Sequence, residues 1–209
     1  MTGDKSGSPP CGIYVRIDDY SDMTDVITKL RQMALVINRA SGYEKNMCVV
    51  ELAFDKDATE QMKDLITIIQ AEGMVAIITG GWLDGADGAL LADHKVIEET
   101  RAALGEEAII GLICQTRAQG EIAIEKRVDY AVLPADPAML GWWRSKTDKL
   151  SLASGKGITN SNCGNLARAG ADLVDVTEYV FNHEKGVMQG TVNILHALDM
   201  AAQPPGALN

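Results

Sequence analysis

The chain has 209 residues, of which 46% are hydrophobic, and this is enough to build one α/β domain around a sizeable core. Its formal net charge is −10, which argues against nucleic acid and anionic membranes as partners, because both are bound by basic surfaces. No apolar run approaches the ~20 residues of a membrane-spanning helix, so we expect no membrane contact and a cytoplasmic protein.

Short apolar runs alternate with amphipathic stretches along the chain, which predicts strands alternating with helices. The predicted strands are 12–17, 47–54, 75–79, 88–92, 108–114, 130–133, 150–154 and 173–177. The predicted helices are 23–40, 57–72, 95–104, 119–126, 138–146, 161–169 and 184–202. This order is typical of a single α/β domain folded as a closed parallel (β/α)8 barrel, or TIM barrel. An open doubly wound sheet is the alternative, because a strand count from sequence can err by one or two.

One interval is too short for the regular pattern. Residues 80–87, "GGWLDGAD", separate the third and fourth predicted strands, whereas a helical crossover usually takes a dozen residues or more. We therefore expect the third helix to be shortened to a turn or missing.

The two ends of the chain are polar and small. The start, "MTGDKSGSPPCG", has no basic segment followed by an apolar stretch, so we expect neither a secretory signal nor a transit peptide. We expect 1–10 to be a disordered tail, 11–203 the barrel domain and 204–209 a second tail.

The cysteine pattern predicts thiols. Cys11, Cys48, Cys114 and Cys163 are far apart, with no CxxC pair and no histidine at metal-ligand spacing. Neither a zinc site nor a disulfide framework is indicated, and we expect all four to be reduced.

Five stretches carry a resemblance to a known family. They are "GIYVRIDD" (12–19), "DGADGALLAD" (84–93), "AIIGLICQT" (108–116), "VDYAVLP" (128–134) and "KGITNSNCGNLARAGADLVDVTEYVF" (156–181). Together they resemble the thiamine phosphate synthase family, which includes the related thiazole tautomerases. The resemblance implies a TIM barrel and a transferase of thiamine biosynthesis, which joins a pyrimidine pyrophosphate to a thiazole phosphate with magnesium on the pyrophosphate.

The positions that serve this reaction in the family are changed here. A Gln-x-Arg-x-Lys pattern at the end of the second strand contacts the pyrophosphate in the family, whereas this chain has Glu51, Ala53 and Asp55. At the two magnesium-binding aspartates of the family stand Gly80 and Lys95. We therefore expect a divergent member with no metal site, no cofactor and an absent or altered family reaction. The alternative is a non-catalytic barrel that binds a small metabolite or a protein partner.

The loops after the last two strands offer a candidate anion site. In "SGKGIT", Gly155 and Gly157 would let backbone amides approach an oxyanion, and Lys156 adds a positive charge. Thr177 ends the predicted eighth strand, and Glu178 follows it. Two interpretations stay open: Lys156 faces a bound anion, or it pairs with Glu178 and closes the site.

Other polar residues are expected to line the mouth of the barrel, where a small-molecule ligand would bind. They are Asp18, Glu51, Asp55, Thr79, Asp93, Lys95, Gln115 and Asp136. Most are acidic, which favours a cationic or amine-bearing ligand. None of them can be assigned as a catalytic residue from the sequence.

The neighbouring pair Trp142 and Trp143 is a candidate interface. Consecutive helical positions lie about 100° apart, so both indole rings cannot point fully inward. The ring at the surface would suit the contact of a homo-oligomer.

Overall fold

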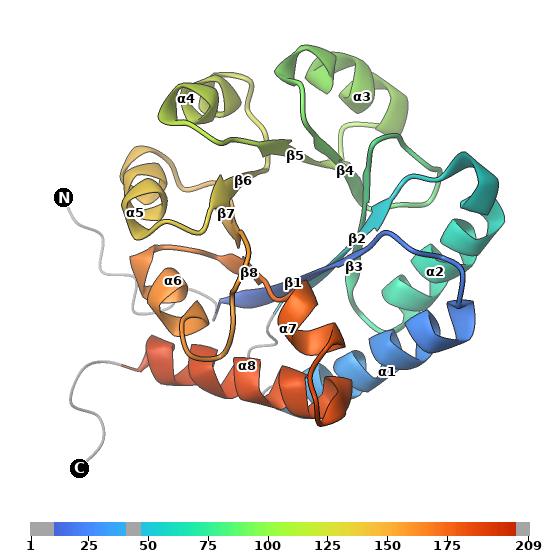
Figure 1. Cartoon of the computed structure of the whole chain (residues 1–209). Coiled ribbons are helices and arrows are strands. Elements are labelled where there is room, and N and C mark those ends of the chain that lie inside the picture. The colour runs from blue at the N-terminus through green and yellow to red at the C-terminus, as the bar shows by residue number, and fades with distance from the viewer. Residues whose placement is uncertain (1–10, 41–46, 204–209) are drawn as a thin grey trace.

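The computed structural model describes residues 11–40 and 47–203, and it contains a closed parallel barrel (Figure 1). The barrel closes because β1 pairs in parallel with both β2 and β8. The strands are β1 (Gly12–Ile17), β2 (Cys48–Ala53), β3 (Val75–Thr79), β4 (Gly88–Leu91), β5 (Ile109–Ile113), β6 (Tyr130–Pro134), β7 (Leu150–Ser154) and β8 (Leu173–Asp175). The predicted (β/α)8 barrel is confirmed, and the open sheet is excluded.

Helices surround the barrel on its outside, as Figure 1 shows. They are α1 (Met23–Ala40), α2 (Thr59–Ala71), α3 (Ile97–Leu104), α4 (Arg117–Glu125), α5 (Pro137–Lys146), α6 (Cys163–Ala169), α7 (Thr177–Phe181) and α8 (Gly186–Ala202). Short 3-10 turns, η1 (Lys56–Ala58) and η2 (His94–Val96), precede α2 and α3. Residues 80–87 contain no helix, so the prediction from the short interval is confirmed.

The end of the eighth strand differs from the prediction. The strand stops at Asp175, and Thr177 begins the additional short helix α7. The Asp175 carboxylate accepts hydrogen bonds from the backbone N–H and the hydroxyl of Thr177, at 3.2 and 2.7 Å. These local bonds turn the chain into a helix before another ladder residue can form.

Apolar side chains pack on both sides of the sheet. Alternate strand residues fill the barrel interior, and the residues between them pack against the helices. The interior cluster contains Tyr14, Val49, Ile77, Leu90, Tyr130, Val132, Leu152 and Leu173. A Cβ at Gly111 would lie only 2.1 Å from Cζ of Tyr130, so the tyrosine ring occupies the place of a β5 side chain.

All four cysteines are thiols, as expected, and Cys48, Cys114 and Cys163 are buried. Of the helices in the described ranges, none has the length and apolar character required to cross a bilayer. The predicted tails, 1–10 and 204–209, lie outside the described residues.

Candidate functional site

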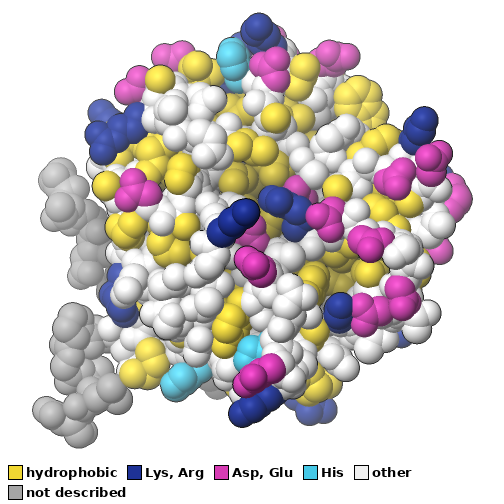
Figure 2. Space-filling view, viewed as in Figure 1, with side chains coloured by type: hydrophobic (Ala, Val, Ile, Leu, Met, Phe, Trp, Pro, Cys, Tyr) yellow, Lys and Arg dark blue, Asp and Glu magenta, His cyan; other side chains and the backbone are white. Residues whose placement is uncertain are grey.

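The candidate site lies at the carboxyl ends of the strands, on the face seen in Figure 2. Near the centre of this face, basic side chains lie next to acidic ones, and hydrophobic side chains are visible beside them in a depression of the surface (Figure 2). The main cavity there has a volume of ≈ 420 Å³. Its lining residues come from the ends of β1, β7 and β8, the loops that follow β1 and β7, and α7 with the residue after it: Arg16, Asp18, Ser154, Gly155, Lys156, Ile158, Asp175, Thr177, Glu178 and Asn182. We call it the main hollow.

A buried carboxylate holds one of its cations in place. Glu51 is only 2% exposed, and its Oε2 accepts hydrogen bonds from the Tyr14 hydroxyl at 2.8 Å and from Arg16 Nε at 3.0 Å. Arg16 and Glu51 meet because they are paired in the β1–β2 register. Burial raises the pKa of Tyr14, and the nearby Tyr130 and Glu51 raise it further. Arg16 is thus pre-positioned at the hollow.

The charge on Arg16 is secure. Partial burial opposes the charged guanidinium, but the charge and hydrogen bond of Glu51 outweigh burial and raise the Arg16 pKa. Only Nε of this guanidinium bonds to another side chain in the described part of the protein. Its terminal nitrogens therefore remain available to a ligand, in the forked geometry that suits carboxylates and phosphates.

The floor of the main hollow is tied together by Asp175. Its Oδ2 accepts a hydrogen bond from the Ser154 hydroxyl at 2.9 Å, and its Oδ1 accepts one from the Thr177 hydroxyl. The backbone N–H of Arg16 donates to Thr177 Oγ1 at 2.8 Å. Strands β1, β7 and β8 are thereby joined by side chains where they end, which makes this part of the site rigid.

The β7–α6 loop presents unused hydrogen-bond donors. Within the described residues, the backbone N–H groups of 155–158 donate no hydrogen bond. Gly157 has φ of 75°, a conformation that favours glycine. Lys156 and Glu178 line the same hollow, but no ion pair joins them among the described side chains. The structure therefore shows no Lys156–Glu178 pair, and a Lys156 that faces a bound anion stays a prediction.

Several aspartates predicted to line the mouth stabilise turns instead. Asp55, Asp93 and Asp136 are the N-cap residues of η1, η2 and α5. Each carboxylate accepts a hydrogen bond from the backbone N–H two residues later, at 2.9–3.0 Å. None of the three lines the main hollow. Their position after a strand reflects helix capping, which has the same sequence signature as a ligand site.

Of the other residues predicted to form the site, some line the main hollow and some lie outside it. Thr79 is half-buried, and its hydroxyl donates to the Leu90 carbonyl at 3.3 Å. Lys95 and Gln115 have exposed side chains outside the hollow. Asp18, Gly155, Lys156, Thr177 and Glu178 are brought together there, and Glu51 contacts it through Arg16. The described polar residues thus converge on β1, β7 and β8.

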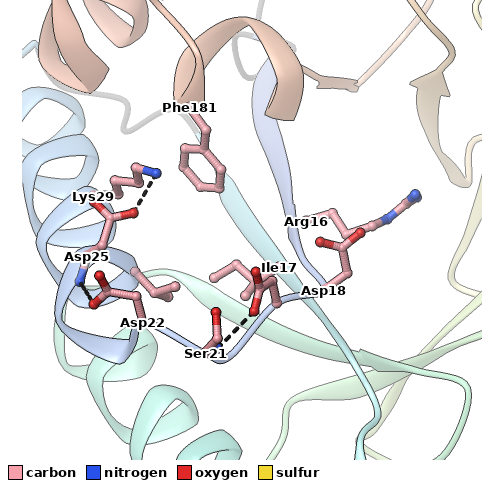
Figure 3. Close-up of a pocket in the computed structure, with 10 residues that line it drawn as sticks. Arg16, Ile17, Asp18, Ser21, Asp22, Asp25, Lys29 and Phe181 are labelled. Carbon is pink, nitrogen blue, oxygen red and sulfur yellow. Dashed lines mark hydrogen bonds and ion pairs between the residues drawn. The ribbon is translucent and has the colours of Figure 1, made fainter.

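A smaller cavity of ≈ 180 Å³ lies beside the main hollow, between the β1–α1 loop and α7. Figure 3 shows that Lys29 points toward Asp25 and Phe181, whereas Arg16 points away from them. Lys29 Nζ lies 2.6 Å from Asp25 Oδ2 and 5.8 Å from the centre of the Phe181 ring. The Lys29 ammonium is thus already paired within the protein, so this cavity has fewer free charged groups for a ligand than the main hollow has.

The residues present do not fit the magnesium ion that the family resemblance implies. At the corresponding positions stand Gly80, which has no side chain, and Lys95, whose cationic side chain repels a divalent ion. The nearby Asp93 uses Oδ1 to cap η2. Within 11–40 and 47–203, no group of three or more His, Cys, Asp or Glu side chains is placed to hold a metal ion.

The two neighbouring tryptophans differ in burial. Trp143 is 1% exposed, and its Nε1 donates to the Lys149 carbonyl at 2.9 Å. Trp142 is half-buried over Gly120, with the Arg117 guanidinium 5.8 Å from its ring centre. The expectation that one ring points inward is confirmed, while an interface at Trp142 stays a prediction.

Four residues that form the hydrogen bonds of the site were not identified from the sequence: Tyr14, Arg16, Ser154 and Asp175. Tyr14 and Arg16 alternate with apolar residues in "IYVRI", which places both on the inner face of β1. The sequence did contain a signal for Arg16, because a charged residue at an inward position of a barrel strand indicates a site residue. Ser154 and Asp175 end their strands, where a polar side chain faces the mouth.

Known structures with the same arrangement define the class of the protein. Thiamine phosphate pyrophosphorylase from Pyrococcus furiosus superposes with a TM-score of 0.73 at 16% identity, over 92% of this chain and 97% of that one. Orotidine 5'-phosphate decarboxylase from Pyrococcus horikoshii gives 0.71 at 16% identity, over 90% and 99%. These similarities show the fold. The protein is a (β/α)8 barrel with its candidate site at the carboxyl ends of the strands.

Sequence relatives place the chain within that class. The thiamine-phosphate synthase of Hyphomonas neptunium is 32% identical over 152 residues, which cover 63% of this chain and 68% of that protein. That of Rhodospirillum centenum is 32% identical over 117 residues, just over half of its length at 56%. No family model matches the chain. The chain belongs to the thiamine-phosphate synthase family.

Proposed function

We propose that this family member binds a small phosphate monoester in the main hollow. We further propose that it does not join a pyrimidine pyrophosphate to a thiazole phosphate at an appreciable rate. The observation that carries the proposal is the set of unused donors on residues that line one cavity: the backbone N–H groups of Gly155, Lys156 and Ile158, the Lys156 ammonium and the terminal nitrogens of Arg16. Backbone amides next to a fixed cation form an anion site.

The loss of the family reaction follows from the charges at the end of β2. Where the family has Gln, Arg and Lys, this chain has a buried Glu51, an Ala53 without polar atoms and an Asp55 that caps η1. Negative charge accumulates on a departing pyrophosphate, and fixed cations stabilise that charge in the transition state. Carboxylates at these positions repel it instead. Arg16 cannot fully replace the lost cations, because its charge is partly balanced by Glu51.

The charges in the main hollow favour a ligand of low net charge. Arg16 and Lys156 are its cations, and Asp18, Asp175 and Glu178 are its anions. Asp175 is bonded by Ser154 and Thr177, whereas the side chains of Asp18 and Glu178 have no partner in the described ranges. A ligand that carries a basic nitrogen as well as a phosphate would match both ends of this cavity.

The proposal can be tested by calorimetric titration of the full chain with thiazole phosphate and with the same thiazole lacking its phosphate. We expect saturable binding of the phosphate form only, because the loop amides and Lys156 recognise the phosphate. Lys156→Ala should weaken this binding by about tenfold. As a control, Lys126→Ala removes an exposed lysine that pairs with Glu98, outside the hollow, and should leave the affinity unchanged. Equal affinity for both thiazoles would contradict the proposal.

A further inference from the structure

A second cavity lies at the opposite end of the barrel. Its volume is ≈ 430 Å³, within the range of about 300–1,000 Å³ that is typical of small-molecule sites. Residues at or next to the amino ends of β2, β3 and β5–β8 line it, so it is separated from the main hollow by the barrel interior. We call it the basal cavity.

The lining of the basal cavity is mostly apolar. Its walls include Val49, Val75, Ile109, Leu150 and Leu173, all of medium size. Tyr130 also lines the cavity, but it is only 4% exposed because its ring packs against Gly111. The cavity is therefore bounded on its inner side by the packed interior cluster, to which Val49, Tyr130 and Leu173 belong.

The rim of the basal cavity is acidic. Glu106 and Glu107 are exposed and form no ion pair within the described ranges. A third carboxylate, Asp129, is already bonded to Arg101 at 3.2 Å and to the Ile110 N–H at 2.9 Å. No Lys, Arg or His is among the described residues that line the cavity. Glu106 and Glu107 thus stand at the entrance of an apolar space without an ion-pair partner among the described residues, although Arg101 also reaches this rim through the Ala108 carbonyl at 3.5 Å.

We propose that the basal cavity binds a small amphipathic amine, with its apolar body between the strand ends and its ammonium group at Glu106 and Glu107. The apolar walls favour an aromatic or branched body. The uncompensated carboxylates favour a cation over an anion of the same shape. This site is independent of the main hollow and of the phosphate monoester proposed for it.

The test uses two probes that share an indole ring and differ in charge, tryptamine and indole-3-propionate. The full chain is titrated with each at neutral pH by calorimetry or ligand-observed NMR. We expect saturable binding of tryptamine and clearly weaker binding of indole-3-propionate. Ala108→Phe, at the half-buried rim, fills part of the cavity and should weaken tryptamine binding by about tenfold or more.

A second variant keeps the test decisive if Ala108→Phe fails to fold. Glu106→Gln combined with Glu107→Gln changes only exposed side chains and should reduce the preference for tryptamine on the order of threefold. Lys156→Ala should leave tryptamine binding unchanged, since Lys156 lies in the main hollow. The proposal is overturned if tryptamine does not bind, if both probes bind equally, or if a folded Ala108→Phe protein binds tryptamine as the wild type does. A failure of phosphate binding at the main hollow would not affect these results.

Discussion

Replacing Arg16 by methionine removes one of the two donors to Glu51 and keeps most of the apolar length of the side chain. Glu51 is 2% exposed in the wild type, and without the guanidinium its remaining side-chain donor would be the Tyr14 hydroxyl, now at 2.8 Å. A buried carboxylate with too few partners destabilises the folded state, because water solvates it better in the unfolded chain. We therefore expect Arg16→Met to lower the free energy of unfolding.

The size of the loss follows from the burial of the two partners. Breaking a fully buried ion pair costs about 3–5 kcal/mol, whereas an exposed pair contributes about 1 kcal/mol or less. Glu51 is buried but the Arg16 side chain is 41% exposed, so the interaction is partly screened by solvent. We expect a loss of about 2 kcal/mol, which for a chain of this size lowers Tm by about 4–8 °C.

Urea and thermal denaturation of four proteins test this estimate: wild type, Arg16→Met, Glu51→Gln and the double variant. The double variant should be more stable than the sum of the single losses implies, because neither partner is left alone. Lys29→Met is the matched control, since it breaks the exposed pair with Asp25 and should cost less than about 1 kcal/mol. A loss from Arg16→Met no larger than that of the control, or strictly additive losses, would refute the reasoning.

Three further predictions concern buried residues of the barrel. Gly111→Ala should destabilise the protein by about 2–3 kcal/mol, because the new Cβ would lie 2.1 Å from Cζ of Tyr130, and adding Tyr130→Leu should restore part of the loss in urea denaturation. Tyr130→Phe should leave stability unchanged or raise it by up to about 1 kcal/mol, since no described residue lies in good hydrogen-bond geometry with the buried hydroxyl, and a fall in Tm would contradict this. Burial raises the pKa of Cys48 from 9.0 to about 12, so its thiol should resist alkylation by iodoacetamide at pH 9 until urea is added, as mass spectrometry can show. Because the folded-state pKa is the higher one, the stability difference between the wild type and Cys48→Ala should be constant below about pH 9 and shrink as the pH rises toward 12.

The barrel was predictable because the patterns that indicate it occur within short stretches of the sequence. Strands buried on both faces read as short apolar runs, and the missing helix after β3 follows from the length of 80–87 alone. Helix α7 was not predictable in this way, since "TEYVF" consists largely of residues that favour strands. It forms because the Asp175 carboxylate bonds to Thr177 and turns the chain there. The helix therefore depends on a specific contact and not on the helix propensity of its residues.

The candidate site was only partly predictable. The glycines and Lys156 of the β7–α6 loop were identified because the loop position in a barrel implies their role. The pair of Arg16 and Glu51 depends on the register between β1 and β2, which the sequence does not state. The capping aspartates Asp55 and Asp93 were placed in the site because a cap and a ligand contact occur at the same point after a strand.

The most direct test of the central claim is an assay of thiamine phosphate formation by the full chain, with magnesium, the pyrimidine pyrophosphate and the thiazole phosphate. A family synthase assayed in parallel confirms that the reagents are competent. Because Glu51, Ala53 and Asp55 replace the residues that contact pyrophosphate in the family, we predict no product above the rate without protein, even though thiazole phosphate binds. Robust turnover that Lys156→Ala abolishes would contradict the account, since it would show that Arg16 and Lys156 support the family reaction after all.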